Sequence, residues 1–234
     1  MRAGSLLVVS LLLSAPSLAS EPPDSQLDPR TGLVHTVDSA LSGADQVVRY
    51  TLDPGKEEPT AIEITSGHDD RSPHLVIDES SVVHVVWQRE EAADQIRALT
   101  IEADGSPGSE RLLSDPGEDC RNPVLALDGS LPWVAYEIHG GSTVAVAVQT
   151  ITDDPDPIGP RIVIGITTFS GSAGVRLHAV DGHLWATWMD GAEAVAYSAY
   201  DPTTEAWSAV AYQDVPDGEL ESALQRVQAD VLRP

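Results

Sequence analysis

Short apolar runs alternate along most of the chain with turns rich in Asp, Gly and Pro. This alternation predicts successive antiparallel β-strands rather than helices. Within residues 67–116 it predicts four strands, at about 73–78, 82–88, 95–102 and 110–114. Four strands in roughly 50 residues are typical of one blade of a β-propeller.

The same pattern recurs. Residues 67–78 and 117–128 align without a gap, lie 50 residues apart and both read G-x-D-x-R-x-P-x-L-x-h-D, where h is aliphatic. Residues 174–181 form a weaker copy. Turn aspartates recur 51, 50 and 47 residues apart, at Asp53, Asp104, Asp154 and Asp201. We therefore expect four repeats, at about 31–66, 67–116, 117–170 and 171–217.

The second strand of each later repeat has bulky side chains on both faces. One column holds His84, Trp133 and Trp185, and the column three residues on holds Trp87, Tyr136 and Trp188. A two-layer sandwich leaves one face of each sheet open, whereas blades stacked side by side cover both. The sequence thus predicts an all-β fold, a small β-propeller-like array of about four four-stranded blades.

These repeats resemble those of secreted bacterial β-propeller proteins of the sialidase-like kind. The resemblance rests on the Arg-x-Pro-x-Leu-x-h-Asp motif, the His/Trp-x-x-Trp/Tyr second strand and the Asp-Gly or Asp-Pro turn. It covers roughly residues 30–215. The Asp-box of sialidases, S-x-D-x-G-x-T-W, is absent from the sequence. The resemblance therefore implies an architecture and says little about a ligand.

The two ends of the repeat domain are less regular. Residues 20–30 look like a linker, so the first repeat lacks a first strand of its own. Residues 226–230 resemble 176–181, and as a strand they would supply the missing one and close a four-bladed ring. Helical spacing is also present, at Leu220, Ala223, Leu224, Val227 and Val231. A C-terminal helix and a closing strand both remain open for residues 218–234.

The first residues have the pattern of a secretory signal peptide. An apolar run from Leu6 to Leu13 follows Arg2, and small residues stand at Ser17 and Ala19. We expect residues 1–19 to be removed and the protein to be exported, to the periplasm or beyond the cell. No later stretch approaches the 18 apolar residues that a membrane-spanning helix needs.

The charge of the chain excludes some partners. Its 13 Lys and Arg oppose 37 Asp and Glu, which gives a formal net charge of −24. A polyanion repels DNA, RNA and anionic lipid, so we expect no nucleic-acid partner. Cys120 is the only cysteine, so the chain has no internal disulfide.

Candidate binding residues lie in the loops that lead into the innermost strands, where propellers normally take ligands. These loops hold Asp69, Arg71, Asp119 and Arg121, with Arg176 and Arg226 in looser register. Arginine holds a carboxylate with two parallel hydrogen bonds, and the sialidase-like resemblance implies clustered arginines on this face. Alternatively, each Asp–Arg pair bridges neighbouring blades, and we expect this structural role for Arg71 and Arg121.

The sequence has no catalytic or metal-binding signature. The acidic runs 153–156 and 68–70 lack the spacing of a calcium loop. The seven histidines form no H-E-x-x-H motif, and no serine lies in G-x-S-x-G. We therefore predict no metal and no cofactor.

The function favoured by these observations is a secreted, non-enzymatic ligand-binding or protein-interaction scaffold. A carbohydrate, a peptide and an envelope protein are all open as partners. One alternative is a sialidase-like, glycan-active hydrolase or lyase in which Arg71 and Arg121 hold an anionic substrate. Another is a subunit that self-associates into a larger ring.

Overall fold

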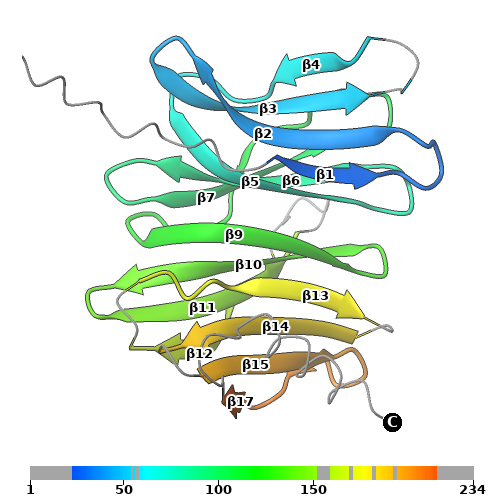
Figure 1. Cartoon of the computed structure of the whole chain (residues 1–234). Coiled ribbons are helices and arrows are strands. Elements are labelled where there is room, and N and C mark those ends of the chain that lie inside the picture. Colours follow the sequence, from blue (N-terminus) through cyan, green and yellow to red (C-terminus); the bar gives the residue numbers. More distant parts are fainter. Residues whose placement is uncertain are drawn as a thin grey trace, which may run out of the picture.

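The computed structural model describes residues 23–53, 55, 58–151, 159–168, 171–180, 183–191 and 194–214. In these ranges the chain forms 17 strands in four antiparallel sheets, stacked one after another (Figure 1). No helix among them is long and apolar enough to cross a membrane. The predicted signal peptide, residues 1–19, lies outside the described residues.

Each sheet is one blade, and its strands follow in chain order from the innermost edge outwards. Blade 1 consists of β1 (Asp24–Leu27), β2 (Val34–Ser42), β3 (Asp45–Asp53) and β4 (Thr60–Glu63). Blade 2 consists of β5 (Asp69–Ile77), β6 (Val83–Glu90), β7 (Gln95–Ile101) and β8 (Arg111–Leu112). The four strands predicted within residues 67–116 are confirmed.

The second half of the chain repeats this arrangement. Blade 3 consists of β9 (Asp119–Asp128), β10 (Leu131–Gly140), β11 (Thr143–Thr150) and β12 (Ile162–Thr167). Blade 4 consists of β13 (Arg176–Val180), β14 (His183–Asp190), β15 (Ala194–Asp201), β16 (Ala206–Trp207) and β17 (Ala211–Asp214). β16 and then β17 pair with the free edge of β15, so together they form the fourth strand of blade 4. The predicted all-β array of four four-stranded blades is confirmed.

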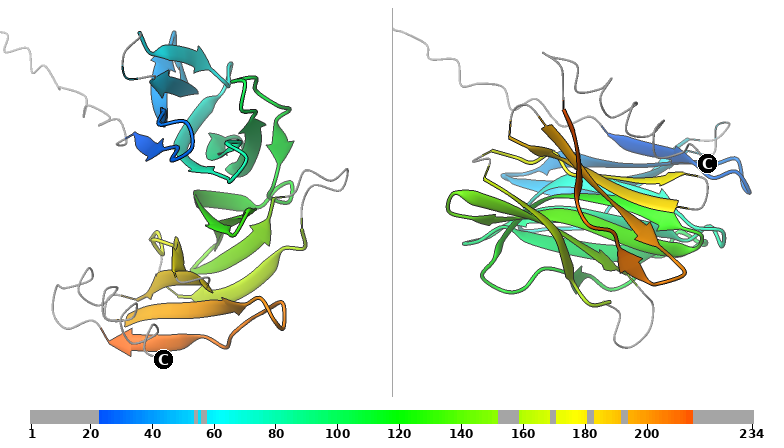
Figure 2. Two further views of the ribbon diagram at one scale, coloured as in Figure 1. Left: turned by 90° about the vertical axis from the view of Figure 1, so that its right-hand side faces the viewer. Right: turned by 90° about the horizontal axis from the view of Figure 1, so that it is seen from below.

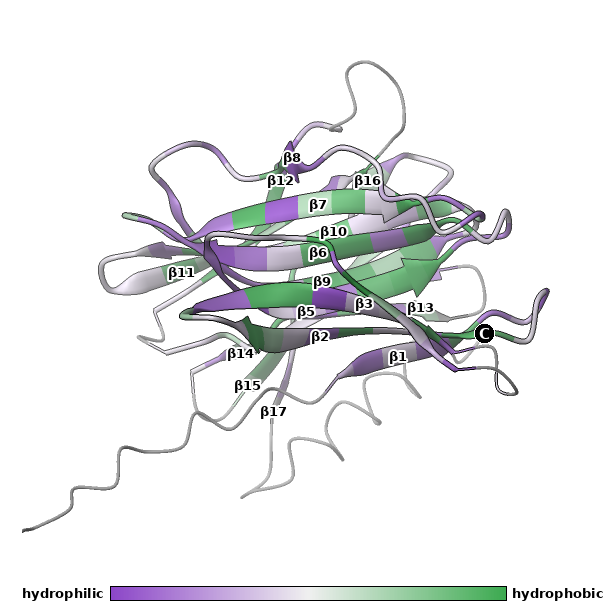
Figure 3. Ribbon diagram, turned by 90° about the horizontal axis from the view of Figure 1, so that it is seen from above, coloured by the Kyte–Doolittle hydropathy of each residue, from purple (hydrophilic) through white to green (hydrophobic). Residues whose placement is uncertain are grey.

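The innermost strands lie side by side, and the blades fan out from them. β5 contacts β1 and β9, and β9 contacts β13. Figure 2 shows the result as an open arc with blade 1 and blade 4 at its two ends. In β5 and β9 the apolar residues lie in the C-terminal half, at Leu75–Ile77 and Val124–Leu127, whereas many of the loops between strands are hydrophilic (Figure 3).

The linker predicted at residues 20–30 contains a strand, which corrects that prediction. In β1, Asp24 pairs with Val37 and Leu27 with Val34. The strand is short and polar, so no apolar pattern marks it. Its side chains bind the next blade instead: Asp24 Oδ2 accepts a hydrogen bond from the Leu75 backbone at 2.9 Å, and the Gln26 amide donates to the Leu75 carbonyl at 3.0 Å.

Blade 1 therefore has an innermost strand of its own, and no C-terminal strand is needed to complete it. Residues 218–234, for which a helix and a closing strand were both open, lie outside the described residues.

Three apolar clusters form the core, one at each junction between neighbouring blades. Trp87 packs with Val37 and Tyr50 of blade 1. One blade further on, Tyr136 packs with Val76 and Val86 of blade 2. Each aromatic residue lies on a second strand and is fully buried against the preceding blade.

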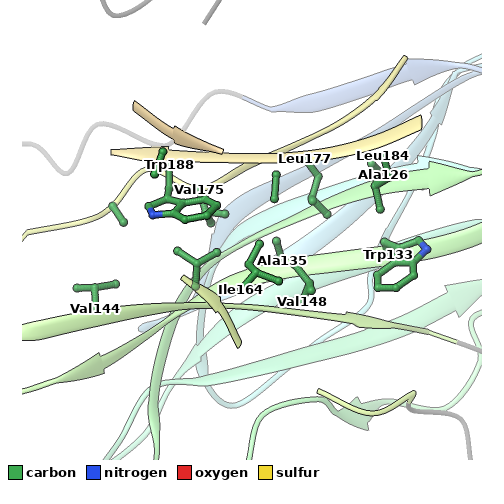
Figure 4. Close-up of a cluster of buried hydrophobic side chains, with 14 residues drawn as sticks. Ala126, Trp133, Ala135, Val144, Val148, Ile164, Val175, Leu177, Leu184 and Trp188 are labelled. Carbon is green, nitrogen blue, oxygen red and sulfur yellow. The ribbon is translucent and has the colours of Figure 1, made fainter. Parts of the chain in front are cut away.

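The third cluster joins blades 3 and 4. Trp188 of blade 4 lies in it opposite Val144 of blade 3, as Figure 4 shows. Trp133, on the opposite face of blade 3 from Tyr136, belongs to the same cluster, and its ring centroid lies 4.7 Å from that of Tyr200. Both faces of blade 3 are thus covered, as the two aromatic columns predicted.

The fit of Trp188 against blade 3 depends on Gly165 of β12. A Cβ atom added at Gly165 would overlap the Trp188 ring. Gly165→Ala therefore forces the indole or the strand to move, and we expect it to lower the free energy of unfolding by about 1–3 kcal/mol. Urea unfolding followed by tryptophan fluorescence measures the change.

Gly140→Ala is the matched control, because a Cβ atom at Gly140 meets only Thr143 Oγ1 at an ordinary 3.6 Å. Equal stability of the two variants would contradict the packing described here.

Candidate functional site

The repeated Arg-x-Pro motif forms a bulge near the start of the innermost strand in blades 2 and 3. Ser72 and Asn122 have φ values of 50° and 53°, in the left-handed region. The strand pairing shifts register next to both residues. A bulge turns the neighbouring side chains away from regular alternation. Here the bulge interrupts the strand pairing just after Arg71 and Arg121, and regular pairing resumes at His74 and Val124.

These two arginines border a polar depression at one end of the inner strands. Two adjoining hollows, of about 310 and 330 Å³, share Arg71, Asp94 and Arg121. We call this depression the arginine hollow. Its remaining lining comes from β5, β6 and the β6–β7 loop of blade 2, from β9 and β10 of blade 3, and from residues 171–172, which precede blade 4. Three blades thus meet around it.

Asp94 lies at the centre of the hollow and joins two blades. Its side chain is only 10% exposed. Its Oδ2 accepts a hydrogen bond from Gln88 Nε2 at 2.8 Å and lies 3.5 Å from Arg71 Nη2 and 3.3 Å from Arg121 Nε. Its backbone carbonyl accepts a hydrogen bond from the Cys120 amide at 2.7 Å. Through these contacts the β6–β7 loop of blade 2 is held against β9 of blade 3.

Both arginines carry further carboxylate partners. Arg71 Nη2 lies 2.9 Å from Glu90 Oε2. Arg121 donates from Nε and Nη2 to the two oxygens of Asp119, at 2.8 and 2.7 Å, and this pairing raises the pKa of Arg121. The two arginine side chains are nevertheless 38% and 43% exposed. The hollow therefore presents paired charges that remain open to water.

Of the predicted binding residues, Arg71, Asp119 and Arg121 come together here. Asp69 does not line the hollow, because its Oδ1 accepts a hydrogen bond from the Gln46 amide of blade 1 at 3.0 Å. Arg176 does not line the hollow either. Arg176 pairs opposite Thr187 in a β13–β14 pairing without a register shift, which places it beyond the position of the bulge. The predicted Arg226 lies outside the described residues.

The expected bridging role holds for one arginine only. Arg121 of blade 3 reaches Asp94 of blade 2, whereas the ion-pair partners of Arg71, Glu90 and Asp94, belong to its own blade. Both side chains are more than a third exposed, so neither arginine is a buried link between blades.

Sequence reasoning missed a buried carboxylate at the edge of the hollow. Glu137, in β10 opposite Arg121, is fully buried. Its Oε1 accepts hydrogen bonds from Ser172 Oγ at 2.9 Å and from the Gly174 amide at 2.8 Å. Its Oε2 accepts from Asn122 Nδ2 at 3.1 Å and bonds His139 Nε2 at 2.9 Å. These four contacts occupy both oxygens and tie blade 3 to the start of blade 4.

The same link recurs between the other blades. Gln88, opposite Arg71 in blade 2, accepts a hydrogen bond from the Asn122 amide of blade 3 at 3.2 Å. In blade 1, Ser39 donates to the Asp70 carbonyl of blade 2 at 3.5 Å. Gln88 and Glu137 directly follow the buried aromatic residues of their second strands. The polar residue that follows Trp87 and Tyr136 was the visible signal for this link.

A second missed feature is the buried ion pair of blade 2. Arg89 donates to both oxygens of Asp70, at 2.8 and 3.0 Å, and to Glu110 Oε1 at 2.7 Å. Arg89 and Asp70 are 5% and 0% exposed. Burial alone lowers the pKa of Arg89, but the hydrogen bonds to Asp70 and Glu110 raise it overall. Asp70 aligns with Cys120 in the next repeat, so the repeat pattern gave no hint of this pair.

Cys120 is also buried, and its environment argues against reactivity. Burial raises the pKa of its thiol to about 12, and the Glu118 carboxylate adds to the effect. The thiolate, which is the reactive form, is therefore disfavoured. Among the described residues, no group of three or more His, Cys, Asp or Glu side chains is placed to hold a metal ion.

Comparison with known proteins finds solved structures with a similar fold. No family model matches the chain, and no curated protein matches it. Among solved structures, the NanB sialidase from Streptococcus pneumoniae aligns with a TM-score of 0.56 and 11% identity over 85% of this chain and 52% of that one. A putative exo-β-1,3-galactanase from Bifidobacterium bifidum aligns with a TM-score of 0.55 and 12% identity, over 84% and 71%.

A GH32 β-fructofuranosidase from Bombyx mori aligns with a TM-score of 0.51 and 10% identity, over 83% of this chain and 49% of that one. The chain therefore spans about half the length of the sialidase and of the fructofuranosidase. Identities this low show a shared fold alone. The chain has a sialidase-like β-propeller fold, which it shares with glycan-active enzymes.

Arg121 is half-exposed and Arg89 is buried, so their replacement by Ala should change the free energy of unfolding by different amounts. Arg121→Ala removes a half-exposed ion pair and should cost less than about 1 kcal/mol of unfolding free energy. Arg89→Ala leaves the buried Asp70 carboxylate without its partner and should cost about 3–5 kcal/mol. Urea unfolding of both variants measures the difference. A loss for Arg121→Ala as large as that for Arg89→Ala would show that Arg121 is a structural strut.

Proposed function

We propose that the chain is a secreted, non-enzymatic scaffold that binds a neutral carbohydrate in the arginine hollow. The observation that supports this most strongly is the set of half-exposed guanidinium–carboxylate pairs around Asp94. Each pair offers N–H donors and oxygen acceptors side by side. Sugar hydroxyls both donate and accept hydrogen bonds, so they match such a surface.

Charge favours a neutral ligand over an anionic one. The hollow contains the cations Arg71 and Arg121 and the acids Glu90, Glu91, Asp94 and Asp119. Its formal charge is 2 − 4 = −2. Both guanidinium groups already have carboxylate partners, so an acidic sugar would meet net repulsion. This argues against the alternative in which Arg71 and Arg121 hold an anionic substrate.

Carboxylates in and beside the hollow already have partners within the protein, which favours binding over hydrolysis. Glycoside hydrolysis needs two carboxyl groups that flank the scissile bond, one to donate a proton and one to attack or activate water. Asp94 and Asp119 are held by arginine. Both oxygens of Glu137 are occupied by protein donors. The fold shared with glycosidases does not transfer their activity.

We also propose that the protein is exported and that its partner is not a nucleic acid. The signal-peptide pattern of residues 1–19 supports export to the periplasm or beyond the cell. The net charge of −24 supports a partner other than nucleic acid.

Isothermal titration with sucrose, galactobiose and xylotriose as neutral probes, and with sialyllactose as the anionic probe, tests the proposal. We expect at least one neutral probe to bind more tightly than sialyllactose. Hydrogen bonds to charged groups contribute about 1.5–3 kcal/mol, so Arg71→Ala and Arg121→Ala should each weaken binding by about tenfold or more.

Arg176→Ala is the matched control, because Arg176 is exposed but does not line the hollow. The proposal fails if Arg176→Ala weakens binding as much as Arg121→Ala, or if sialyllactose alone binds. Release of reducing sugar from a probe, abolished by Asp94→Asn, would establish the hydrolase alternative instead.

A further inference from the structure

The outer end of blade 4 has a face with no neighbouring blade among the described residues. Leu184, Ala186 and Trp188 of β14 pack against blade 3. Side chains alternate along a strand, so Trp185 and Thr187 point the other way. The register with β15 places Val195 and Tyr197 on this same face. We call it the outer face of blade 4.

Parts of this face are shielded from water, although Trp185 and Tyr197 themselves are half-buried. Val195 is 0% exposed and Thr187 is 2% exposed. The rings of Trp185 and Tyr197 lie 6.3 Å apart, and the indole nitrogen of Trp185 has no contact with solvent. Burial also lowers the pKa of His178, which lies 3.5 Å from Thr187 Oγ1. A sheet face open to solvent does not bury side chains to this degree, so this face needs a cover.

The aromatic columns explain why this end needs a cover. Trp185 lies in the same column as Trp133, which packs against the next blade along the arc. The other end of the array is different. On the outer face of blade 1, Arg49 pairs with Asp38 at 2.6 Å and Ser25 bonds Thr36 at 2.9 Å, with Val47 as a buried exception. That end is mostly polar and hydrated, whereas the end at blade 4 is aromatic.

The chain supplies a segment suited to this task. β17 ends at Asp214 and pairs with β15 from Ala194 to Tyr197, so the last 20 residues start at the edge of the outer face. They carry a stripe with helical spacing, at Leu220, Ala223, Leu224, Val227 and Val231. A helix over residues 218–231 is about 21 Å long, close to the roughly 26 Å of the eight-residue β14.

The alternative for this segment, a closing strand, has no place to pair. A closing strand would complete the inner edge of blade 1, but β1 pairs with β2 there. We propose that residues 218–231 form an amphipathic helix whose apolar stripe covers the outer face of blade 4 and ends the array at four blades. A second copy of the chain is then excluded from this face, which opposes the self-associated ring.

Two substitutions in the full chain test the proposal. Leu224→Asp places a charge in the stripe, and Gln225→Asp adds the same charge beside it. Leu224→Asp should lower Tm by about 5 °C or more and shift tryptophan emission to the red, because the outer face becomes exposed. Gln225→Asp should leave both unchanged. Adding Trp185→Phe to Leu224→Asp should remove the red shift, which assigns it to Trp185.

Hydrogen exchange of the unmodified chain gives an independent result, which decides the matter even if Leu224→Asp does not fold. We expect the amides of residues 222–231 to exchange at least tenfold more slowly than in an unfolded chain. Unprotected exchange, or identical effects of the two substitutions, overturns the proposal. So does a wild-type dimer in light scattering that Trp185→Asp converts to monomer, because a second copy would then be the cover.

Discussion

The packing of blades 2 and 3 against a neighbouring blade on both faces is the constraint on which the rest of this structure depends. Trp87, Tyr136 and Trp188 each insert into the preceding blade, and Trp133 does the same towards the next one. Because such sheets have no face to offer to water, they stack in series. The stacking brings the ends of the innermost strands together, and the polar groups at those ends become the arginine hollow.

The polar network at the hollow satisfies groups that the stacking leaves without strand partners. Innermost strands of neighbouring blades are not hydrogen-bonded as one sheet. Side chains such as Asp24, Gln88 and Glu137 therefore bind the backbone of the next blade. Most polar residues near the axis serve this structural purpose. The half-exposed pairs of Arg71 and Arg121 around Asp94 are the part of this network that faces solvent.

The sequence repeat predicted the blades because strands buried on both faces, and the turns between them, require the same residue types at regular intervals. It did not predict β1, since a four-residue polar strand has no such trace and is held by contacts with Leu75. Arg71, Asp119 and Arg121 were predictable from the repeated motif. Asp94 and Glu137 were not, because their roles depend on register across two blades. Arg176 lies away from the hollow, since the bulge that positions Arg121 is absent from the β13–β14 pairing.

The central claim is that the paired guanidinium groups of the hollow contact a neutral sugar. The Nε–H signals of Arg71, Arg121 and Arg89 in a ¹⁵N-labelled chain test it most directly. Arg89 is the internal reference, because it is buried and paired with Asp70 and Glu110. The account predicts that a neutral oligosaccharide shifts the signals of Arg71 and Arg121 and leaves that of Arg89 in place. Shifts produced only by sialyllactose, or none at Arg71 and Arg121 with a neutral sugar that binds the chain, would contradict it.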